Sequence, residues 1–562
     1  MVAEQPIEDW ALIPWRKLEM KMYRLQKRIY RASERGNVKA VHNLQRLLMK
    51  SEAARCLAVR RVTQDNQGKN TAGVDGIKSV SPQRRPILVK ALRNHQALKA
   101  QPARRVWIPK PGKSEKRPLG IPTMLDRAHQ ALVKAALEPE WEAKFEPNSY
   151  GFRPGRGCHD AIEAIFTSVG HKEKYVLDAD IQGCFDNIAH EPLLNKLNTY
   201  PTMRRAIKGW LKAGVRVGFT EEPTDKGTPQ GGVVSPLLAN IALHGLETTV
   251  LGVYSNRPDR PKVVRYADDF VILHPTLEGI EKARGIVEQW LGDMGLNLKA
   301  SKTRVVHTRR TLNDQGAGFD FLGFTVRQYD AGKTRCGRNN QKEPTGFVAR
   351  ITPSKEAISR HRKELSRIVR AHRTVPQGLL IQKLNPVIKG WSDYYRTVVA
   401  KASFETCDNG LFPVLKRWAT HRHPKKGDKW VKRKYWRTKG GDTWAFMTPD
   451  GLTLADHSKT PIRRHIKVRA TASPYDGNLV YWSRRLRDHP VASTRIALLL
   501  RRQEGRCARC GLLFQDTDHI EADHIIPESL GGTWDISNRE ALHRHCHDEK
   551  TKLDGSLTSK AS

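Results

Sequence analysis

Two adjacent carboxylates, Asp268 and Asp269, stand at the junction of two short apolar runs. The runs, Val-Val-Arg-Tyr-Ala before the acids and Phe-Val-Ile-Leu after them, are rich in β-branched and aromatic residues and predict a hairpin with the acids at its tip. Two anions held side by side repel each other unless a cation lies between them. Mg²⁺ takes such oxygen ligands and completes its shell with substrate phosphates, so the pair indicates phosphoryl transfer. The alternative is a solvated acidic turn, since aspartate is a common turn residue.

A third carboxylate favours the metal site. In Tyr-Val-Leu-Asp-Ala-Asp-Ile (175–181), the strand period of two places Asp178 and Asp180 on one face, and Asp180 stands near the end of the run. Asp180 is therefore the candidate third ligand, while Asp178 and Asp186 are better explained as capping or ion-pairing residues. Residues 226–240 contain Gly-Thr-Pro-Gln-Gly-Gly and predict a glycine loop that opens a helix, where backbone can approach a nucleotide closely.

A second group of chemically active residues lies near the C-terminus. Four soft or borderline metal ligands form two knuckles that are sufficient for a closed tetrahedral zinc site: Cys507, Cys510, His543 and Cys546. A redox role for the Cys-x-x-Cys pair is less favoured, because no thioredoxin-like unit surrounds it. Four further polar residues stand between and just after the knuckles: Asp523, His524, Asn538 and His547.

The net charge narrows the class of partner. Of 562 residues, 98 are Lys or Arg and 58 are Asp or Glu, which gives a formal net charge of +40. This excess predicts nucleic acid rather than a membrane as the partner, because no run of about 18 apolar residues occurs. The start, Met-Val-Ala-Glu-Gln-Pro, is not a signal peptide, so a cytoplasmic location is expected. Five scattered cysteines are expected to be reduced packing residues: Cys56, Cys158, Cys184, Cys336 and Cys407.

Several elements must position these residues. Residues 10–63 mix aromatic, aliphatic and many basic residues and predict amphipathic helices, whose surplus of base favours an RNA-facing surface over an ordinary solvated face. Residues 104–122 predict a strand, a basic turn and a second strand, a hairpin suited to gripping phosphates. Residues 329–346 and 470–478 are polar and rich in turn-forming residues, so we predict linkers and domain borders near both.

Seven segments extend these motifs: Arg-Pro-Leu-Gly-Ile-Pro (117–122), Ser-Tyr-Gly-Phe-Arg-Pro-Gly-Arg-Gly-Cys-His-Asp-Ala (149–161), Asp-Ile-Gln-Gly-Cys-Phe-Asp-Asn-Ile (180–188), Thr-Pro-Gln-Gly-Gly (228–232), Tyr-Ala-Asp-Asp (266–269), Gly-Leu-Asn-Leu-Lys-Ala-Ser-Lys-Thr (295–303) and Phe-Leu-Gly-Phe (321–324). In order and spacing they resemble the reverse transcriptase and maturase proteins encoded by group II introns. The resemblance runs from about Asn70 to beyond His423.

The resemblance implies a role for each matching residue. Asp180, Asp268 and Asp269 would surround two Mg²⁺ ions that activate the primer 3′-hydroxyl and stabilise the pyrophosphate leaving group. Lys302 would protonate pyrophosphate. Phe185 would be a steric gate that selects dNTPs by clashing with a 2′-hydroxyl, with a core aromatic as the alternative. The nucleotide is expected to contact three further residues: Lys110, Arg117 and Gln230.

Residues 384–396 predict a helix break at their proline, followed by aromatic residues at helical spacing. They resemble the thumb-like maturase domain of the family, and we expect Trp391, Tyr394 and Tyr395 to be packing rather than base-stacking residues. Residues 416–439 carry eleven Lys or Arg against a single acid, which predicts a nucleic-acid surface for intron RNA or the DNA target. The aromatic residues expected to offer stacking faces there are Trp418, Trp430, Tyr435 and Trp436.

The C-terminal group resembles an HNH nuclease of the ββα-metal class. The resemblance makes His524 the general base on water, and Asp523 and His547 the ligands of a single divalent ion at the scissile phosphate. Asn538 would orient His524 across the hairpin. Members of that class often carry Cys where this chain has His543, and imidazole replaces thiolate readily at zinc. The alternative is a zinc ribbon that only binds DNA.

We therefore predict a multidomain α+β protein: a right-hand polymerase whose fingers and palm contain an antiparallel sheet, an α-helical thumb or maturase domain, a basic DNA-binding region and a C-terminal zinc-containing ββα-metal HNH domain. The expected domains are a basic helical extension with the start of the fingers (1–100), the reverse transcriptase fingers and palm (101–328), the thumb and maturase domain (329–420), the basic DNA-binding region (421–490) and the HNH endonuclease (491–562).

The predicted function is threefold: RNA-directed DNA polymerase, splicing maturase and DNA endonuclease. The expected partners are the protein's own group II intron RNA, target DNA and dNTPs, without a membrane, in the bacterial cytosol or nucleoid or in an organelle. Three alternatives stay open. A retron-like or diversity-generating reverse transcriptase would lack the maturase and HNH segments. A splicing factor with a dead palm, or a standalone homing nuclease with a non-catalytic body, would lack one of the three acids.

Overall fold

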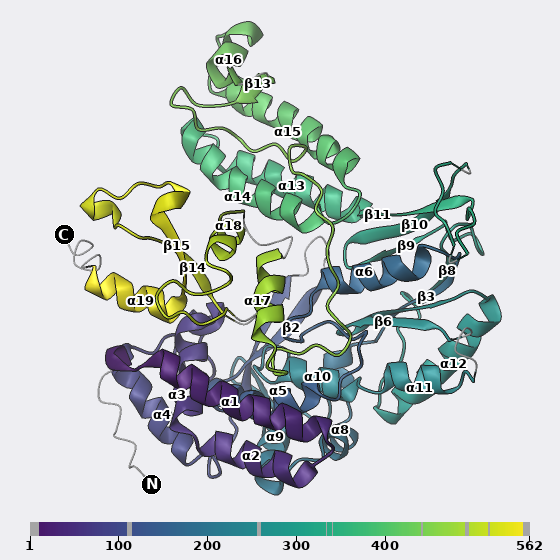
Figure 1. Ribbon diagram of the computed structural model, residues 1–562, viewed down its shortest axis with the longest axis vertical. Helices are drawn as coiled ribbons and strands as arrows, with labels where there is room; N and C mark the ends of the chain where they lie inside the picture. The colour runs from purple at the N-terminus through teal and green to yellow at the C-terminus, as the bar shows by residue number, and fades with distance from the viewer. Residues whose placement is uncertain are drawn as a thin grey trace.

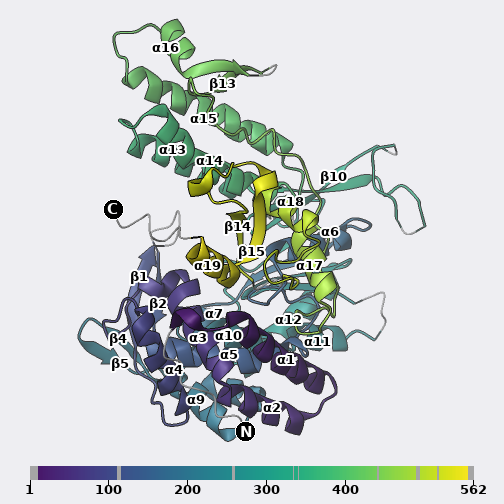
Figure 2. The same ribbon diagram turned by 60° about the vertical axis from the view of Figure 1, so that its left-hand side comes forward.

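The computed structural model describes residues 10–109, 115–255, 260–332, 334–339, 341–439, 442–488, 494–514 and 518–554. N-terminal helices form one end of the molecule, a four-stranded sheet lies near its centre, and a group of helices extends from the sheet toward the opposite end (Figure 1). Helix α19 (Arg544–Leu553) lies against the N-terminal helices in both views (Figure 2). The protein is thus a mixed α/β molecule of several domains.

The N-terminal layer is built from basic amphipathic helices, as predicted for residues 10–63. Each of the first two helices buries one face, with Ile29 and Leu48 fully buried, and the third is buried almost all round. Their apolar faces share one core with the long fifth helix. These helices are α1 (Trp15–Glu34), α2 (Val38–Lys50), α3 (Glu52–Arg60), α4 (Arg85–Arg93) and α5 (Met124–Glu142).

A four-stranded sheet of order β2-β1-β4-β5 carries the hairpin predicted for residues 104–122. Its two long strands pair antiparallel, with Trp107 opposite Pro118. Most of the predicted basic turn, including Lys110, lies outside the described residues. The strands are β1 (Ala103–Pro109), β2 (Lys116–Ile121), β4 (Val215–Val217) and β5 (Thr220–Glu222).

The central sheet has the order β6-β7-β3-β8, and all its neighbours are antiparallel. The predicted acid-tipped hairpin and the predicted strand before Asp180 are confirmed. Leu177 and Ile272 face the core shared with the N-terminal layer, whereas Val176 and Val271 face a second core, so both faces of the sheet are covered. The strands are β3 (Tyr175–Asp180), β6 (Lys262–Tyr266), β7 (Asp269–His274) and β8 (Arg304–His307).

Helices cover the two faces of the central sheet. Helix α6 (Cys158–Val169) packs on the face that carries Val176, and helix α12 (Leu277–Asp293) packs on the face that carries Leu177. The helices of this region are α6 (Cys158–Val169), α7 (Cys184–Asn187), α8 (His190–Leu197), α9 (Pro201–Lys212), α10 (Ser235–Ala242), α11 (Leu246–Gly252) and α12 (Leu277–Asp293).

A three-stranded antiparallel sheet follows, made of β9 (Phe319–Phe321), β10 (Phe324–Asp330) and β11 (Phe347–Pro353). The predicted linker at residues 329–346 is wrong, because β10 and β11 pair along their whole length, from Phe324 opposite Pro353 to Asp330 opposite Phe347. The segment therefore joins the two strands of a hairpin, and a border there would divide this sheet. Polar, turn-rich composition is common to hairpin loops and linkers, so composition alone does not separate them.

The helical arm, defined as residues 355–446, extends from this sheet (Figure 1). The predicted helix break is wrong, because Pro386 lies inside a continuous helix. An internal proline costs about 3 kcal/mol, but burial of Leu384 and Ile388 on either side offsets it at about 1.5–3 kcal/mol each. The elements of the arm are α13 (Lys355–Ala371), α14 (Gln377–Tyr395), α15 (Lys401–His421), α16 (Asp428–Tyr435), β12 (Trp436–Lys439) and β13 (Asp442–Phe446).

Most aromatic residues of the arm are core residues. Trp391, Tyr394 and Tyr395 pack against the second core, as predicted. The expectation of exposed stacking faces in residues 416–439 is wrong for three of the four aromatics, which are buried: Trp418, Tyr435 and Trp436. Trp430 is 39% exposed, with the Lys434 ammonium 5.0 Å from its ring. Residues 416–439 therefore share the core of α13–α15.

An extended segment, residues 455–478, runs from the arm back to the central sheet, and we call it the strap (Figure 1). At its start the Ser458 amide donates to Asp408 at 2.9 Å, and midway the Val468 amide donates to Asp160 at 2.7 Å. Near its end Tyr475 is buried and donates its hydroxyl to Glu138 at 2.8 Å. The linker predicted at residues 470–478 is thus a packed part of the strap.

The C-terminal unit begins with a helix whose Trp482 is buried in the second core. Two antiparallel strands and a helix that directly follows the second strand give the ββα arrangement predicted for this region. Among the described residues, no helix combines the length and the hydropathy needed to cross a membrane. The elements are α17 (Leu479–Asp488), α18 (Thr494–Arg502), β14 (Ile520–His524), β15 (Arg539–His543) and α19 (Arg544–Leu553).

Candidate functional site

The three predicted acids converge at one end of the central sheet. Asp180 is the last residue of β3 and lies directly opposite Asp269, the first residue of β7. Asp268 belongs to the two-residue turn between β6 and β7, where Ala267 has a φ of +58°. A left-handed conformation at alanine is strained, and such strain concentrates at functional sites. The Lys302 ammonium donates to the Asp180 carboxylate.

The site is electrostatically prepared for a cation. Burial, together with the neighbouring charges of Asp268 and Asp180, raises the pKa of Asp269 from 3.8 to about 7. Burial also raises the pKa of Asp268. Hydrogen bonding to Asp180 raises the pKa of Lys302. A set of three carboxylates that repel one another fits a hard divalent metal ion, which takes oxygen ligands.

Asp178 lies outside this group, as predicted. Its carboxylate accepts a hydrogen bond from the Arg304 guanidinium at 2.9 Å, and this pair accounts for the acid without a metal. Asp186 lies on α7 and accepts a hydrogen bond from the Gln230 amide at 3.4 Å. Both acids therefore have partners on the protein itself.

Arg265 holds the acidic turn, a role that was not predicted from the sequence. Its guanidinium, which is buried, donates to the Ala267 carbonyl and to the Asn240 side chain, both at 3.0 Å. Asn240 in turn donates to the Gly151 carbonyl at 2.8 Å. The strained turn is thus tied to α10 and to the loop before α6. A charged residue in the middle of an apolar strand was the signal that could have revealed this role.

The glycine loop at residues 226–232 packs between β2 and α7. The Thr228 amide donates to the Phe185 carbonyl at 2.6 Å, and the Gly120 amide donates to the Gln230 carbonyl at 2.6 Å. A Cβ atom on Gly227, whose φ is +84°, would approach the Asp186 carbonyl oxygen to 2.6 Å, so only glycine fits there. The loop therefore fixes Phe185 and Gln230 relative to the acids.

The other residues predicted to contact the nucleotide differ in their burial and in their contacts. Phe185 is half-buried, and the ring of Phe152 meets it edge-on with centroids 6.0 Å apart. Arg117 on β2 is exposed, and its charge acts on Asp268. Lys110 lies outside the described residues. Phe152, which has a φ of +59°, was missed, although it stands in the quoted Tyr-Gly-Phe-Arg-Pro motif.

The four predicted zinc ligands come together in the C-terminal unit. The ligand atoms of Cys507, Cys510, His543 and Cys546 all lie within 4.8 Å of one another, and all four residues are buried. His543 Nδ1 is 3.3 Å from the Cys510 sulfur, and its Nε2 is 3.2 Å from the Asp518 carboxylate. A carboxylate on the outer nitrogen is the usual partner of a metal-binding histidine. This group could hold a metal ion.

Two of the predicted nuclease residues meet between β14 and α19. The Asp523 carboxylate on β14 lies 3.8 Å from His547 Nε2 on α19. The Lys550 ammonium pairs with Asp523 at 3.0 Å and with Glu540 at 3.2 Å. No role for Lys550 was predicted from the sequence, although its place three residues after His547 puts both on one face of the helix. Carboxylate oxygen and imidazole nitrogen together suit a divalent metal ion.

His524 faces the other side of the β14–β15 hairpin, as alternation along a strand requires. Its Nε2 lies 3.2 Å from the guanidinium of Arg539, the residue directly opposite it. The Trp534 ring packs edge-on against it at 4.8 Å. The Asn538 side chain is bonded to loop backbone, accepting from the Ile526 amide at 2.9 Å. Asn538 therefore fixes the backbone that follows His524, rather than its ring as predicted.

Comparison with known families matches four parts of the chain. Residues 10–92 match the N-terminal domain of reverse transcriptase, and residues 108–326 match reverse transcriptase (RNA-dependent DNA polymerase). Residues 358–436 match the group II intron maturase-specific domain, and residues 507–553 match HNH endonuclease. The three acids of the central sheet lie within the second match, and the Cys₃His group within the last.

Individual relatives agree with these matches. "Group II intron-encoded protein LtrA" of Lactococcus lactis subsp. cremoris is 37% identical over 238 residues, which are 40% of this chain and 39% of LtrA. "Protein YkfC" of Escherichia coli (strain K12) is 34% identical over 328 residues, 50% of this chain and 83% of YkfC. "Maturase-like protein 1" of Euglena gracilis is 26% identical over 389 residues, 68% of this chain and 76% of that protein. The chain thus spans about two-fifths of LtrA but most of YkfC, and it belongs to the family of group II intron-encoded reverse transcriptases and maturases.

Proposed function

We propose that the chain is an RNA-directed DNA polymerase that also acts as an intron-splicing maturase and as a DNA endonuclease. The observation that carries the polymerase proposal is the convergence of Asp180, Asp268 and Asp269 at one end of the central sheet. In this proposal the N-terminal layer and the β1–β2 hairpin serve as fingers, the central sheet as the palm, and the helical arm as the thumb and maturase domain. The basic segment after residue 420 is an extension of that arm, because it shares the arm's core.

The proposed polymerase mechanism assigns a task to each side chain. Two Mg²⁺ ions held by the three acids would supply the Lewis acidity that activates the primer 3′-hydroxyl and stabilises pyrophosphate. Lys302, hydrogen-bonded to Asp180, would donate a proton to the leaving pyrophosphate. The hydrogen bond to Asp180 raises the pKa of the Lys302 ammonium, so Lys302 would give up this proton more readily once that hydrogen bond is broken.

Four further residues would hold the incoming dNTP. Arg117, and Lys110 beyond the end of β1, would bind the triphosphate through charge-assisted hydrogen bonds. Gln230 would line the nucleotide pocket on the glycine loop. Phe185 would exclude the 2′-hydroxyl, and its contact with Phe152 would hold the Phe185 ring in position.

Primer extension by the full chain on an RNA template, with Mg²⁺ and dNTPs, tests the polymerase proposal. Asp268→Ala should lose extension by 1,000-fold or so, as expected when charge stabilisation at the reacting centre is removed. Asp178→Asn is the matched control, because it lies on the same strand but pairs with Arg304. Undiminished extension by Asp268→Ala, or no extension by the unaltered chain, would refute the proposal.

The endonuclease proposal rests on the ββα unit and its Cys₃His group. We assign structural zinc to the Cys₃His group, and a divalent ion at the scissile phosphate to Asp523 and His547. His524 would take the proton from water, with Asn538 fixing the backbone beside it. Arg539 on His524 Nε2 would have to move aside when DNA binds.

The nuclease test uses the protein loaded with its intron RNA and a labelled target duplex. His524→Ala should lose cleavage of the strand cut by the protein, while the strand cut by intron RNA is still cleaved. His519→Ala is the control, because His519 is exposed and lies just before β14. Equal cleavage of both strands by His524→Ala would contradict the assignment.

The maturase proposal rests on the match of residues 358–436 and on the basic surface of the arm. Intron RNA would splice with the protein's help and reverse-splice into one DNA strand, and the nuclease would cut the other strand and expose a 3′-hydroxyl for copying. This cycle would take place where intron RNA and target DNA meet, which for a bacterium is the cytosol or nucleoid. Sequencing RNA that copurifies with the chain should recover one intron; a sample of random cellular RNA would contradict this.

A further inference from the structure

A second group of metal-ligating residues lies in the helical arm, far along the chain from the acids and from the Cys₃His group. His361 on α13, Cys407 on α15 and His457 on the strap bring one ligand atom each within 4.8 Å of one another. All three side chains are buried. The sequence gives no hint of the group, because its members come from three distant segments, and Cys407 was expected to be a simple packing residue.

The orientation of both histidines is fixed from outside the group. The Asp408 carboxylate lies 2.6 Å from His457 Nδ1, and it also accepts the His457 amide at 3.0 Å. His457 therefore turns Nε2 toward His361, whose Nε2 is 2.8 Å away. The His361 ring stacks on Trp391 with centroids 4.5 Å apart and planes 7° apart. A carboxylate behind one imidazole is the arrangement that holds a metal-binding histidine in place.

The separations suit a tetrahedral zinc ion. Zinc bonds of about 2.0–2.1 Å to nitrogen place two tetrahedral nitrogen ligands about 3.3 Å apart, so the two Nε2 atoms need to part by only about half an ångström. Thiolate and imidazole are the ligands that zinc prefers. A hydrogen bond between the two imidazoles explains their contact, but it does not explain why a cysteine sulfur is the third member.

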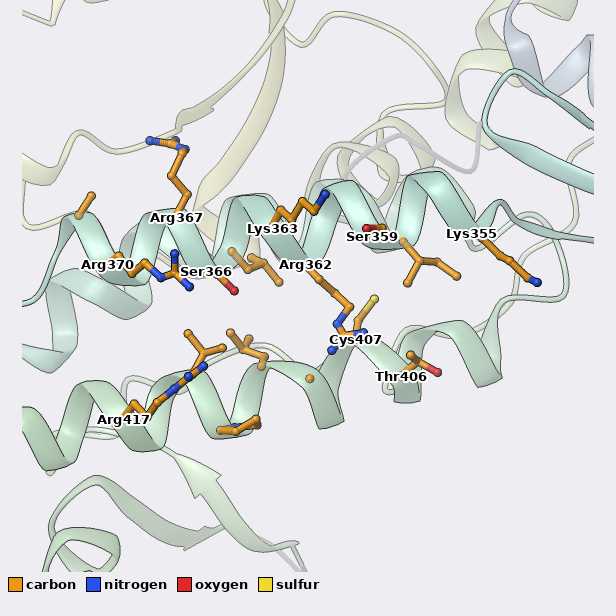
Figure 3. Close-up of a pocket in the computed structure, with 17 residues that line it drawn as sticks. Lys355, Ser359, Arg362, Lys363, Ser366, Arg367, Arg370, Thr406, Cys407 and Arg417 are labelled. Atoms are coloured by element: carbon orange, nitrogen blue, oxygen red, sulfur yellow. The ribbon is translucent and has the colours of Figure 1, made fainter. Parts of the chain in front are cut away.

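The group adjoins a groove of the arm. Cys407 lines a groove of about 980 Å³ between α13 and α15 (Figure 3). Arg362 extends from α13 toward Cys407 in this view, and its positive charge compensates that of a thiolate. The group therefore lies directly beside the groove, with Cys407 as the member that the two share.

We propose that His361, Cys407 and His457 bind a zinc ion that joins α13, α15 and the start of the strap. The ion would fix the strap to the arm at its first contact, beside Asp408. This proposal is independent of the proposed polymerase and nuclease activities, since it uses none of their residues.

Zinc content of the purified full chain, measured by elemental mass spectrometry after treatment with a chelating resin, tests the proposal. The double variant Cys507→Ser/Cys510→Ser, which removes the nuclease zinc, should keep about one zinc per chain. Adding Cys407→Ser to it should remove that zinc, whereas adding Cys56→Ser, at a buried cysteine of the N-terminal layer, should not. A double variant without zinc, or a zinc that survives Cys407→Ser, would overturn the proposal.

A second measurement guards against variants that fail to fold. Asp408→Asn keeps the size of the side chain but weakens its hold on His457, so zinc affinity in a chelator competition should fall about 10- to 100-fold. Unfolding of the arm, followed by circular dichroism, should shift to higher temperature when ZnCl₂ is added to the double variant. Unchanged affinity in Asp408→Asn, or no shift with ZnCl₂, would count against the site.

Discussion

The closeness of the three acids destabilises the folded chain when all three are ionised, and the effect is clearest at Asp269. The folded-state pKa of Asp269, about 7, lies above its ordinary value of 3.8. Between these two pH values the folded chain keeps a proton that the unfolded chain has released, so stability falls as pH rises through this window. The penalty is largest above pH 7, but Asp269 is exposed, so solvent screening makes it smaller than the pKa shift alone implies.

Asp269→Asn removes that charge, so the metal-free variant should unfold at a higher temperature than the unaltered chain at pH 8. The difference should shrink toward pH 5, where Asp269 is protonated in the fold. Thermal unfolding in a chelating buffer at several pH values measures this. The same pH dependence in both proteins would show that Asp269 carries no penalty. Mg²⁺ should stabilise the unaltered chain more than the variant.

Selection between dNTP and NTP can also be argued from one side chain. If Phe185 is the gate, Phe185→Ala opens space for a 2′-hydroxyl, and incorporation of NTPs relative to dNTPs should rise about 10-fold or more. Single-nucleotide extension assays measure the ratio. Phe219→Ala is the control, because that ring is fully exposed on the loop between β4 and β5. An unchanged ratio in Phe185→Ala would make Phe185 a core aromatic only.

Among the elements, the strap depends on one buried acid. Asp160 on α6 accepts hydrogen bonds from His465 at 2.9 Å and from Arg485 at 2.6 Å. Burial opposes its charge, but the hydrogen bond from His465 and the charge of Arg485 outweigh this and hold the pKa of Asp160 below its usual range. A lowered carboxyl pKa adds stability above about pH 4, and that contribution is lost as the pH falls further.

Asp160→Asn leaves Arg485 without its counter-charge, so it should lower the free energy of unfolding by about 3–5 kcal/mol at pH 7. The difference from the unaltered chain should narrow below about pH 4. Urea unfolding at both pH values measures it. Asp330→Asn is the control, because that side chain is 85% exposed in its pair with Arg309. A loss that is independent of pH would mean that shape, rather than charge, is what Asp160 contributes.

The sequence predicts some elements well for physical reasons that are local. The β6–β7 hairpin and the strand before Asp180 follow from β-branched runs, and the four zinc ligands follow from short spacings. Contacts between distant segments leave no such pattern. Asp160 with the strap, and His361 with Cys407, join residues whose separation along the chain varies with the fold. Pro386 inside α14 was mispredicted because tertiary burial outweighed a local preference.

At the scale of the whole molecule, the nuclease unit is docked on the N-terminal layer. The Glu19 carboxylate on α1 lies 3.2 Å from His545 on α19 and 3.8 Å from Arg60 on α3. His545 and Arg60 are both buried, whereas the Glu19 side chain is 34% exposed, so solvent reaches the acid but not the two cations. Glu19 therefore joins the two ends of the chain.

Glu19→Ala leaves both cations without this partner, and amide exchange in α19 should accelerate about 10-fold or more. Hydrogen exchange followed by mass spectrometry resolves this helix from the others. Primer extension should stay unchanged, since Glu19 lies outside the proposed polymerase site. Glu191→Ala, at an exposed pair with Lys208, is the control. Unchanged exchange in α19 would show that other contacts hold the nuclease unit.

The path of the strap also bears on how such a chain could gain or lose a nuclease. Residues 455–478 return to the central sheet before the C-terminal unit begins. The arm is therefore attached to the rest of the molecule at both of its ends, through β11 and through the strap at Asp160. A chain that stopped at the end of α17 would keep Asp160, Trp482 and both attachments of the arm. One that stopped after α15 would leave the arm hanging from a single attachment. The 74 residues after Asp488 are therefore separable from the polymerase, whereas the strap is a structural part of it.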